Sequence, residues 1–379
     1  MDFSLTKHEE LFLQMIREFA EKEVKPLAAE IDEQERFPTE TVEKMSKLGL
    51  MGIPFPVEYG GAGGTNQIYS MAVEELSRVC GTTGVVVSAH TSLCCAPIYE
   101  MGNEEQKKKY LPKLCSGEWI GAFGLTEPNA GTDAAGQQTT AVETEDGYVL
   151  NGSKIFITNA EYAHVYIVIA MTDKSLGVKG ISAFIVEKDT PGFSIGKKEK
   201  KLGIRGSATC ELIFENCVIP KENLLGKVSE GFKIAMKTLD GGRIGIAAQA
   251  LGIAQGAMDE TVKYVKERKQ FGKAIGQFQN TQFQLADLET KIQASRLLVR
   301  VAAYKKDKKM PYSVDAAQAK LFAAETAMEV TVKAIQFHGG YGYTRDYPVE
   351  RMMRDAKITE IYEGTSEVQR MVISANLLK

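Results

Sequence analysis

The chain has 379 residues, of which 44% are hydrophobic and 25% are charged. This composition is ordinary for a globular protein with a large core, and the length predicts two or three domains. Lys and Arg number 46 and Asp and Glu number 49, so the formal net charge is -3. With this balance the protein surface as a whole is not positively charged, which argues against nucleic acid or an anionic membrane as the main partner.

Membrane insertion and secretion are not expected either. Apolar runs such as residues 165–171 are far shorter than the roughly 20 residues that a membrane-spanning helix needs. The first residues contain an early acid and lack the charged-then-apolar pattern of a secretory leader. We therefore expect a cytoplasmic protein.

Cysteine and histidine usage gives no indication of a metal site. The cysteines lie at positions 80, 94, 95, 115, 210 and 217, without paired spacing, and the histidines at 8, 90, 164 and 338 have no metal-ligand spacing. The neighbours Cys94 and Cys95 could be redox-active, but buried reduced thiols are the more common state of cysteines in a cytosolic protein. We expect no metal ion.

The sequence pattern predicts helices, then strands, then helices. In the first part, Thr6-Lys7-His8-Glu9 forms a capping box at the start of a predicted helix. Apolar residues at helical spacing predict further helices near Glu40–Leu48, at Gln67–Val79 and around Glu104–Leu114. Between Trp119 and Leu225 the chain changes to short β-rich runs at residues 149–150, 155–157, 165–170, 181–186 and 212–214. Beyond Gly231 the pattern is helical again, with breaks near residues 272–276, 308–311 and 339–343. We predict a mainly α protein with a central β domain, divided into residues 1–118, 119–226 and 227–379.

Familiar nucleotide-binding motifs are absent from the sequence. The glycines at 60, 61, 63 and 64 do not form G-x-G-x-x-G because Asn66 takes the last position, and no Walker A motif occurs. A doubly wound nicotinamide-binding fold and a P-loop enzyme are therefore not expected.

Three other stretches each allow two interpretations. Residues 123–133 (FGLTEPNAGTD) could present backbone N–H groups to a polar ring or a phosphate, or could be an ordinary polar turn. Arg268-Lys269-Gln270-Phe271-Gly272 could bind a pyrophosphate, or could be a helix end favoured by cations. Glu363, followed directly by Gly364 after a Gly-rich break at 339–342, could point into a cleft or could lie in a surface loop.

Taken together, these motifs resemble the acyl-CoA dehydrogenases over essentially the whole chain, and most closely the short-chain (butyryl-CoA) members. The matching segments are residues 126–133, Phe156-Ile157-Thr158, Arg268 to Gly272, Gln336 to Gly340 and residues 361–365. The resemblance implies an N-terminal helical domain, a middle β-sheet or barrel domain and a C-terminal four-helix bundle. It also implies tightly bound FAD and the α,β-desaturation of an acyl-CoA thioester (butyryl-CoA to crotonyl-CoA), or the reverse reduction in a fermentative organism.

The resemblance also implies the roles of individual residues. The flavin ring would be wrapped by Phe123, Leu125, Thr126, Gly131, Thr132, Phe156, Ile157 and Thr158. Its phosphate and adenosine side would contact Arg268, Phe271 and Gln279, while Gln336, Gly339 and Gly340 would reach the FAD of a neighbouring subunit, and Thr365 and Glu367 would also touch FAD. Substrate would contact Thr132, Asp240, Arg243, Tyr362 and Gly364. This chain has Phe156, Asn129 and Thr132 where many relatives have Trp, Gly and Ser.

The expected chemistry needs a base for a weakly acidic α-proton. Glu363 is the candidate, because a carboxylate dried by the acyl chain has a raised pKa and a stronger basicity. Some family members carry the base at the position of Gly242, which has no side chain here.

The resemblance further implies electron-transfer flavoprotein as redox partner and a homotetramer. Specificity for another chain length or a branched acyl group, a flavin oxidase (whose base in such relatives is Asp) and a catalytically inactive homologue are the alternatives.

Overall fold

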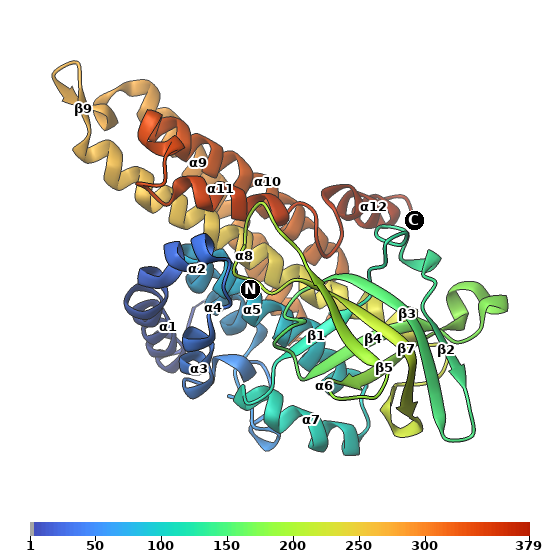
Figure 1. Ribbon diagram of the computed structural model, residues 1–379. Helices are drawn as coiled ribbons and strands as arrows, with labels where there is room; N and C mark the ends of the chain where they lie inside the picture. Colours follow the sequence, from blue (N-terminus) through green and yellow to red (C-terminus); the bar gives the residue numbers. More distant parts are fainter. Residues whose placement is uncertain (1–3) are drawn as a thin grey trace.

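The computed structural model describes residues 4–379, and its element order is the predicted one of helices, sheet and helices (Figure 1). The first helical part contains α1 (Lys7–Phe19), α2 (Ala28–Gln34), α3 (Thr39–Lys47), α4 (Asn66–Val79), α5 (Gly81–Ala89), α6 (Ala96–Met101) and α7 (Glu104–Ser116). The capping box that opens α1 is confirmed: the Glu9 amide donates to Thr6 Oγ1 at 3.3 Å and the Thr6 amide to Glu9 Oε2 at 2.8 Å. The sequence did not predict α2, α5 or α6.

The middle part is one twisted, largely antiparallel sheet. Its strands are β1 (Gly121–Gly124), β2 (Thr140–Glu143), β3 (Gly147–Ile157), β4 (Val165–Met171), β5 (Ile181–Glu187), β6 (Phe193–Lys198), β7 (Cys210–Pro220) and β8 (Leu224–Leu225). They run in the order β6-β7-β3-β2-β4-β5-β8, and β1 adds in parallel to β4. Along β4, Val165, Ile167 and Ile169 pack toward the helices, whereas Tyr166 and Val168 pack toward β3 and β7. Both faces of this strand are therefore covered, which explains its continuous apolar run.

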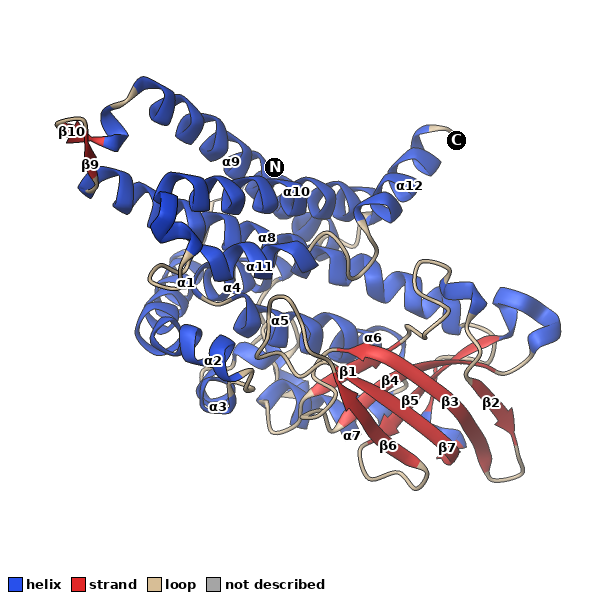
Figure 2. Ribbon diagram, turned by 45° about the horizontal axis from the view of Figure 1, so that its top comes forward, coloured by secondary structure: helices blue, strands red, loops and turns tan. Residues whose placement is uncertain are grey.

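The second helical part contains α8 (Gly231–Glu267), the hairpin β9 (Lys269–Gln270) and β10 (Lys273–Ala274), α9 (Gln279–Asp307), α10 (Ser313–His338), α11 (Val349–Ile358) and α12 (Ser366–Leu377). Figure 2 shows the hairpin at the end of the bundle that lies farthest from the sheet. The predicted fold class is confirmed. None of the described helices is long and apolar enough to cross a membrane.

Glycines allow α4 and α8 to pack with their backbones in contact. A Cβ on Gly252 would lie 2.2 Å from the Glu74 carbonyl oxygen, and one on Gly256 would lie 1.9 Å from that of Arg78. Real Cβ atoms do not come so close, so larger residues would push the two helices apart. This packing joins the first helical part to the second along the length of α8.

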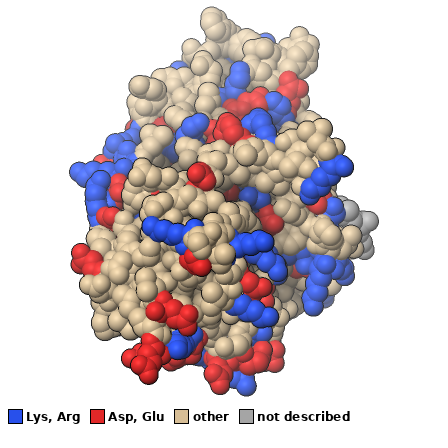
Figure 3. Space-filling model, turned by 90° about the vertical axis from the view of Figure 1, so that its right-hand side faces the viewer, with Lys and Arg blue, Asp and Glu red and all other residues tan. Residues whose placement is uncertain are grey.

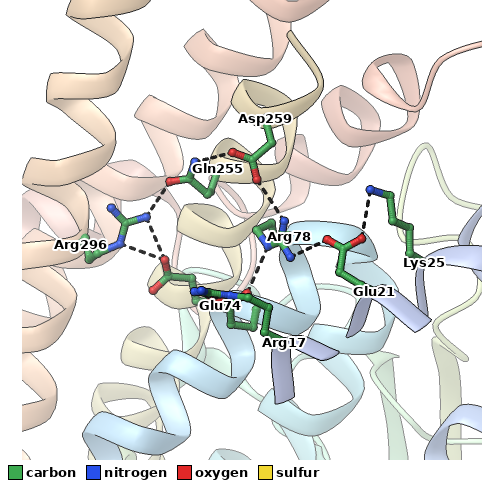
Figure 4. A network of polar contacts seen from close by, with 9 residues as sticks. Arg17, Glu21, Lys25, Glu74, Arg78, Gln255, Asp259 and Arg296 are labelled. Carbon is green, nitrogen blue, oxygen red and sulfur yellow. Dashed lines mark hydrogen bonds and ion pairs between the residues drawn. The ribbon is translucent and has the colours of Figure 1, made fainter. Parts of the chain in front are cut away.

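Charged side chains connect the same helices at their surface (Figure 4). Arg78 on α4 binds Glu21 at 2.6 Å and Asp259 on α8 at 3.1 Å. Arg296 on α9 binds Glu74 on α4 at 2.9 Å. Elsewhere acidic and basic side chains are interspersed, as the face in Figure 3 shows.

A buried ion pair ties α2 to α11. Arg354 donates to the two carboxylate oxygens of Asp32 at 3.0 and 2.6 Å, and both residues are buried. Arg345 and Glu33 form an ion pair between the same regions, but their side chains are 65% and 60% exposed.

These two pairs give a matched test of stability. Arg354→Met should lower the free energy of unfolding by about 3 kcal/mol, because Asp32 would remain as a buried charge without its partner. Arg345→Met should cost less than about 1 kcal/mol, since an exposed ion pair contributes little. Urea unfolding followed by circular dichroism measures both free energies. Equal losses in the two variants would show that the buried ion pair contributes no more to stability than the exposed one.

Candidate active site

A cavity of about 320 Å³ lies where the sheet meets the helices. Twelve of the predicted site residues line it: Phe123, Leu125, Thr126, Gly131, Thr132, Phe156, Ile157, Thr158, Arg243, Tyr362, Glu363 and Gly364. They come from β1, the loop after it, the end of β3, α8 and the loop before α12. The fold thus brings together motifs that are more than 200 residues apart in sequence.

Other lining residues were missed by the sequence analysis. They are Val85, Ala89, Leu93, Asp133, Ala134, Ala135, Phe232, Met236, Leu239 and Val368. Val85, Ala89 and Leu93 recur every four residues along α5 and the following π-helical turn (His90–Cys95), so their spacing carried a signal. It went unused because the segment was not predicted to be a helix.

Glu363 lies in a strained turn beside the cavity. Its φ is +52° and that of Gly364 is +94°, both in the left-handed region that non-glycine residues seldom adopt. Thr365 follows and caps α12 by accepting from the Val368 amide at 3.3 Å. The turn directs the Glu363 side chain against α8.

The Glu363 carboxyl group is desolvated. Its Oε2 is buried and has no hydrogen-bond partner among the described residues. Burial raises the pKa of Glu363 to about 8, although the positive charges of Lys320 and Arg243 oppose the shift. A carboxylate with these properties can take up a proton near neutral pH.

Gly242 on α8 leaves the space that this carboxylate occupies. A Cβ on Gly242 would lie 1.9 Å from Glu363 Oε2 and 2.9 Å from Leu93 Cδ2. The carboxylate therefore lies where a side chain from position 242 would begin.

Arg243, the next residue on α8, is buried and lines the same cavity. Its guanidinium donates to Asp240 at 2.6 Å, and Asp240 also accepts from Ser313 Oγ at 2.9 Å. Asp240 does not line the cavity and supports Arg243 from behind. Its predicted contact with substrate therefore stays a prediction.

The sheet side of the cavity presents an aromatic ring and hydroxyl groups. Phe156, at the end of β3, has a φ of +60° and is 59% exposed, next to Thr158. Thr126 and Thr132 lie on the loop that follows β1. An exposed ring among hydroxyl groups in a concave site suits a flat, polar heteroaromatic ligand.

A buried ion pair holds this loop against β3. Lys154 is fully buried and donates to Glu127 at 2.6 Å and to the Leu125 carbonyl oxygen at 3.2 Å. Glu127 also accepts from the backbone amides of Gln138 and Thr139 at 2.5 and 3.0 Å. Lys154 therefore lies on the buried side of β3, whereas Phe156, two residues further on, is exposed to the cavity.

The remaining predicted FAD residues form a second group at the far end of the bundle (Figure 2). Arg268 follows Arg243 by 25 residues along the uninterrupted α8, which places it about 37 Å further along the helix axis. Its guanidinium lies 5.8 Å from the ring centre of Tyr341, which follows Gly339 and Gly340. Phe271 has a φ of +52° and is 94% exposed. Gln279 begins α9 and Gln336 lies in the last turn of α10.

One chain therefore does not bring its predicted FAD residues together. The structure groups Arg268, Phe271 and Gln279 with Gln336, Gly339 and Gly340, although the sequence analysis had assigned only the last three to a neighbouring subunit. Thr365 and Glu367 lie beside the cavity, next to its lining residues Gly364 and Val368.

Fold and cavity together define an oxidoreductase of the acyl-CoA dehydrogenase class. Family models described as the N-terminal, middle and C-terminal domains of acyl-CoA dehydrogenase match residues 6–118, 122–217 and 229–378. The chain belongs to the acyl-CoA dehydrogenase family.

Three similar proteins agree with this assignment. The chain is 64% identical over 379 residues, covering 100% of both sequences, to the short-chain specific acyl-CoA dehydrogenase of Clostridium acetobutylicum. The butyryl-CoA dehydrogenase structure from Megasphaera elsdenii has a TM-score of 0.98 and 53% identity, with both chains fully covered. The third is a structure described in connection with the electron transferring flavoprotein of Acidaminococcus fermentans and flavin-based electron bifurcation. It has a TM-score of 0.99 and 58% identity, and both chains are fully covered.

Proposed function

We propose that this protein catalyses the FAD-dependent α,β-dehydrogenation of a short-chain acyl-CoA, with Glu363 as the base that takes the α-proton. The observation that carries the proposal is the buried, unpartnered Oε2 of Glu363 beside the cavity. A carboxylate paired with a cation or exposed to water would be a much weaker base. The similarity to short-chain specific relatives supports the substrate class.

The cavity fits the isoalloxazine ring of FAD. The exposed face of Phe156 can stack on a flat ring, and the hydroxyl groups of Thr126, Thr132 and Thr158 can donate to or accept from its polar edge. A Cβ on Gly131 would meet nothing within 4 Å, so the wall is open there. When bound, FAD supplies at its N5 the acceptor for the hydride that leaves the β-carbon.

The protein's own part in the reaction is to hold the thioester and move one proton. The α-proton passes to a carboxylate oxygen of Glu363, and the thioester oxygen would accept a hydrogen bond from the Glu363 backbone N–H as negative charge develops on it. Arg243 presents its guanidinium to the same wall, held in place by its ion pair with Asp240. The bound acyl chain would exclude water and so keep the carboxylate basic.

The apolar side chains of the cavity suit a short acyl group. Leu93, Met236 and Leu239 narrow it from the helical side, and we expect a preference for acyl groups near four carbons.

Electrons would pass from the reduced flavin to electron-transfer flavoprotein, which the structure reported with such a protein supports. A cytoplasmic location is part of the same proposal and agrees with six free, buried cysteines.

We further propose that each complete site needs two subunits within a homotetramer. The group around Arg268 and Gly339 lies too far from the cavity of its own chain to reach the same FAD. Large apolar side chains are exposed on the C-terminal helices: Phe283, Leu297, Val332 and Met371 are 50–62% exposed. A second copy of the chain would cover them.

Replacing the base tests the central proposal. Glu363→Gln should bind FAD and fold normally, but butyryl-CoA should bleach the flavin at least ~10²–10⁴-fold more slowly, the contribution typical of a general base. In the unchanged enzyme kcat/KM should rise with pH and level off above about 8, because the carboxyl group is protonated below this value and cannot accept the α-proton. Stopped-flow bleaching across pH measures both; a wild-type rate in Glu363→Gln would refute the assignment.

Moving the base tests its geometry. Gly242→Glu combined with Glu363→Gly should recover part of the activity, because a side chain from position 242 enters the space now filled by Glu363 Oε2. The single change Gly242→Ala should instead lower the rate, since its Cβ would displace the carboxylate. The same bleaching assay measures the two variants, with FAD content as the control for folding.

Mixed oligomers test the shared site. Arg268→Ala and Glu363→Gln should each be inactive alone, yet co-expression should restore activity. Random association makes about half of the dimers mixed, and one of the two sites in each mixed dimer has both residues intact, so roughly a quarter of all sites should be active. If Arg268 served the cavity of its own chain, every mixed site would lack one of the two residues and no activity would return. Differently tagged subunits, purified through both tags, allow the measurement.

A further inference from the structure

A buried lysine supports the Glu363 turn from behind. Lys320 lies on α10, is fully buried, and donates from Nζ to the Gly364 carbonyl oxygen at 2.7 Å. Gln369 on α12 donates to the same oxygen from Nε2 at 2.8 Å. These two hydrogen bonds fix the orientation of the Gly364–Thr365 peptide, directly after the left-handed residues Glu363 and Gly364, of which Glu363 is the strained one.

Lys320 and Glu363 are also each other's counter-charges. Lys320 forms no ion pair within 4.0 Å among the described residues, and Glu363 Oε2 has no hydrogen-bond partner among them. By contrast Arg243, the other cation near Glu363, is already paired with Asp240 at 2.6 Å. A buried charge without compensation is costly, so the ammonium and the carboxylate stabilise one another across the Gly364 peptide.

We propose that Lys320 is a positioning residue for the base: it anchors the Glu363–Gly364 turn through the Gly364 carbonyl and supplies the positive charge that compensates the carboxylate. The inference rests on the proposed role of Glu363 and deepens it. Lys320 lies behind the turn and touches neither the cavity nor a reacting atom.

The direction of the coupling follows from the charges around the pair. Burial lowers the pKa of Lys320 to about 8, and Glu363 opposes this shift, as do Glu360 and Glu367. Lys320 and Arg243 in turn oppose the upward shift of the Glu363 pKa. Tyr362 and Tyr69, which also face Glu363, are neutral because burial raises their pKa values. Removal of the Lys320 charge must therefore raise the pKa of Glu363 further.

Three variants separate charge from anchoring. Lys320→Met removes the hydrogen bond and the charge, Lys320→Gln can retain a donor without the charge, and Gln369→Met removes the second hydrogen bond to Gly364 without altering any charge. Lys357→Met is the matched control: Lys357 is an exposed lysine that binds Glu360 at 2.6 Å, three residues before Glu363.

The protonation of Glu363 can be measured directly in the holoenzyme. Infrared difference spectra, with Glu363→Gln as the blank, give the midpoint at which the carboxylic C=O band disappears. In Lys320→Met and Lys320→Gln this midpoint should move up by about one pH unit or more, and kcat/KM below the midpoint should fall about tenfold per unit, since the ionised fraction falls by that factor. FAD content should not change.

The other variants should behave differently. Gln369→Met should slow bleaching without moving the midpoint, and Lys357→Met should leave both unchanged. A wild-type midpoint in Lys320→Gln, or an equal shift in Lys357→Met, would overturn the proposal. Failure of Glu363 as base would instead appear as full activity in Glu363→Gln, whatever the Lys320 variants do.

Discussion

The site depends on keeping one carboxylate in a place where water cannot stabilise it. Glu363 fits against α8 only because residue 242 is glycine, since a Cβ there would lie 1.9 Å from its Oε2. It reaches that position only through a backbone with φ of +52°, a conformation that costs of order 1 kcal/mol or more in a non-glycine residue. Desolvation of the carboxylate costs more, and it is the same desolvation that makes the group basic. Packing of α8, α10 and α12 must therefore stabilise a turn that would not form alone.

Buried lysines support both walls of the cavity in a similar way. Lys154 holds the loop after β1 through Glu127 and the Leu125 carbonyl oxygen, and Lys320 holds the Glu363–Gly364 turn through the Gly364 carbonyl oxygen. The difference lies in the counter-charge. Glu127 is 2.6 Å from Lys154 and accepts two further backbone hydrogen bonds, so its pKa is lowered and it remains ionised. Lys320 has no such close partner among the described residues: Glu363, Glu360 and Glu367 act on it only from a distance, and burial raises the pKa of Glu363 to about 8.

Much of the fold and the cavity could be predicted from the sequence because the signals are local. The capping box at Thr6, the glycine breaks and the change from helical to β-rich pattern each depend on a few neighbouring residues, and all three appear in the structure. α5 was missed because Gly81–Ala89 is buried on all sides, so no polar face sets off the four-residue spacing of Val85 and Ala89. Lys320 was missed for a related reason: a lysine within an Ala-rich helix is typical of a solvated face, and only the packing of other helices, α8 and α12 among them, around α10 makes it internal.

The separation of the predicted FAD residues into two groups could not be predicted from local sequence patterns. The helical pattern predicted beyond Gly231 has no break before residues 272–276, and α8 indeed runs unbroken for 37 residues. No local pattern shows, however, that a helix of this length keeps Arg268 away from Arg243 and the cavity. A rigid helix cannot fold back to bring Arg268 to the cavity of its own chain, so the length of α8 limits which residues one chain can contribute to a site. If both ends of α8 contact FAD, they must do so in different sites, and folding of one chain cannot complete either of them. Oligomerisation would then be a condition for cofactor binding, and Phe271, which is 94% exposed in one chain, would be covered by a second subunit.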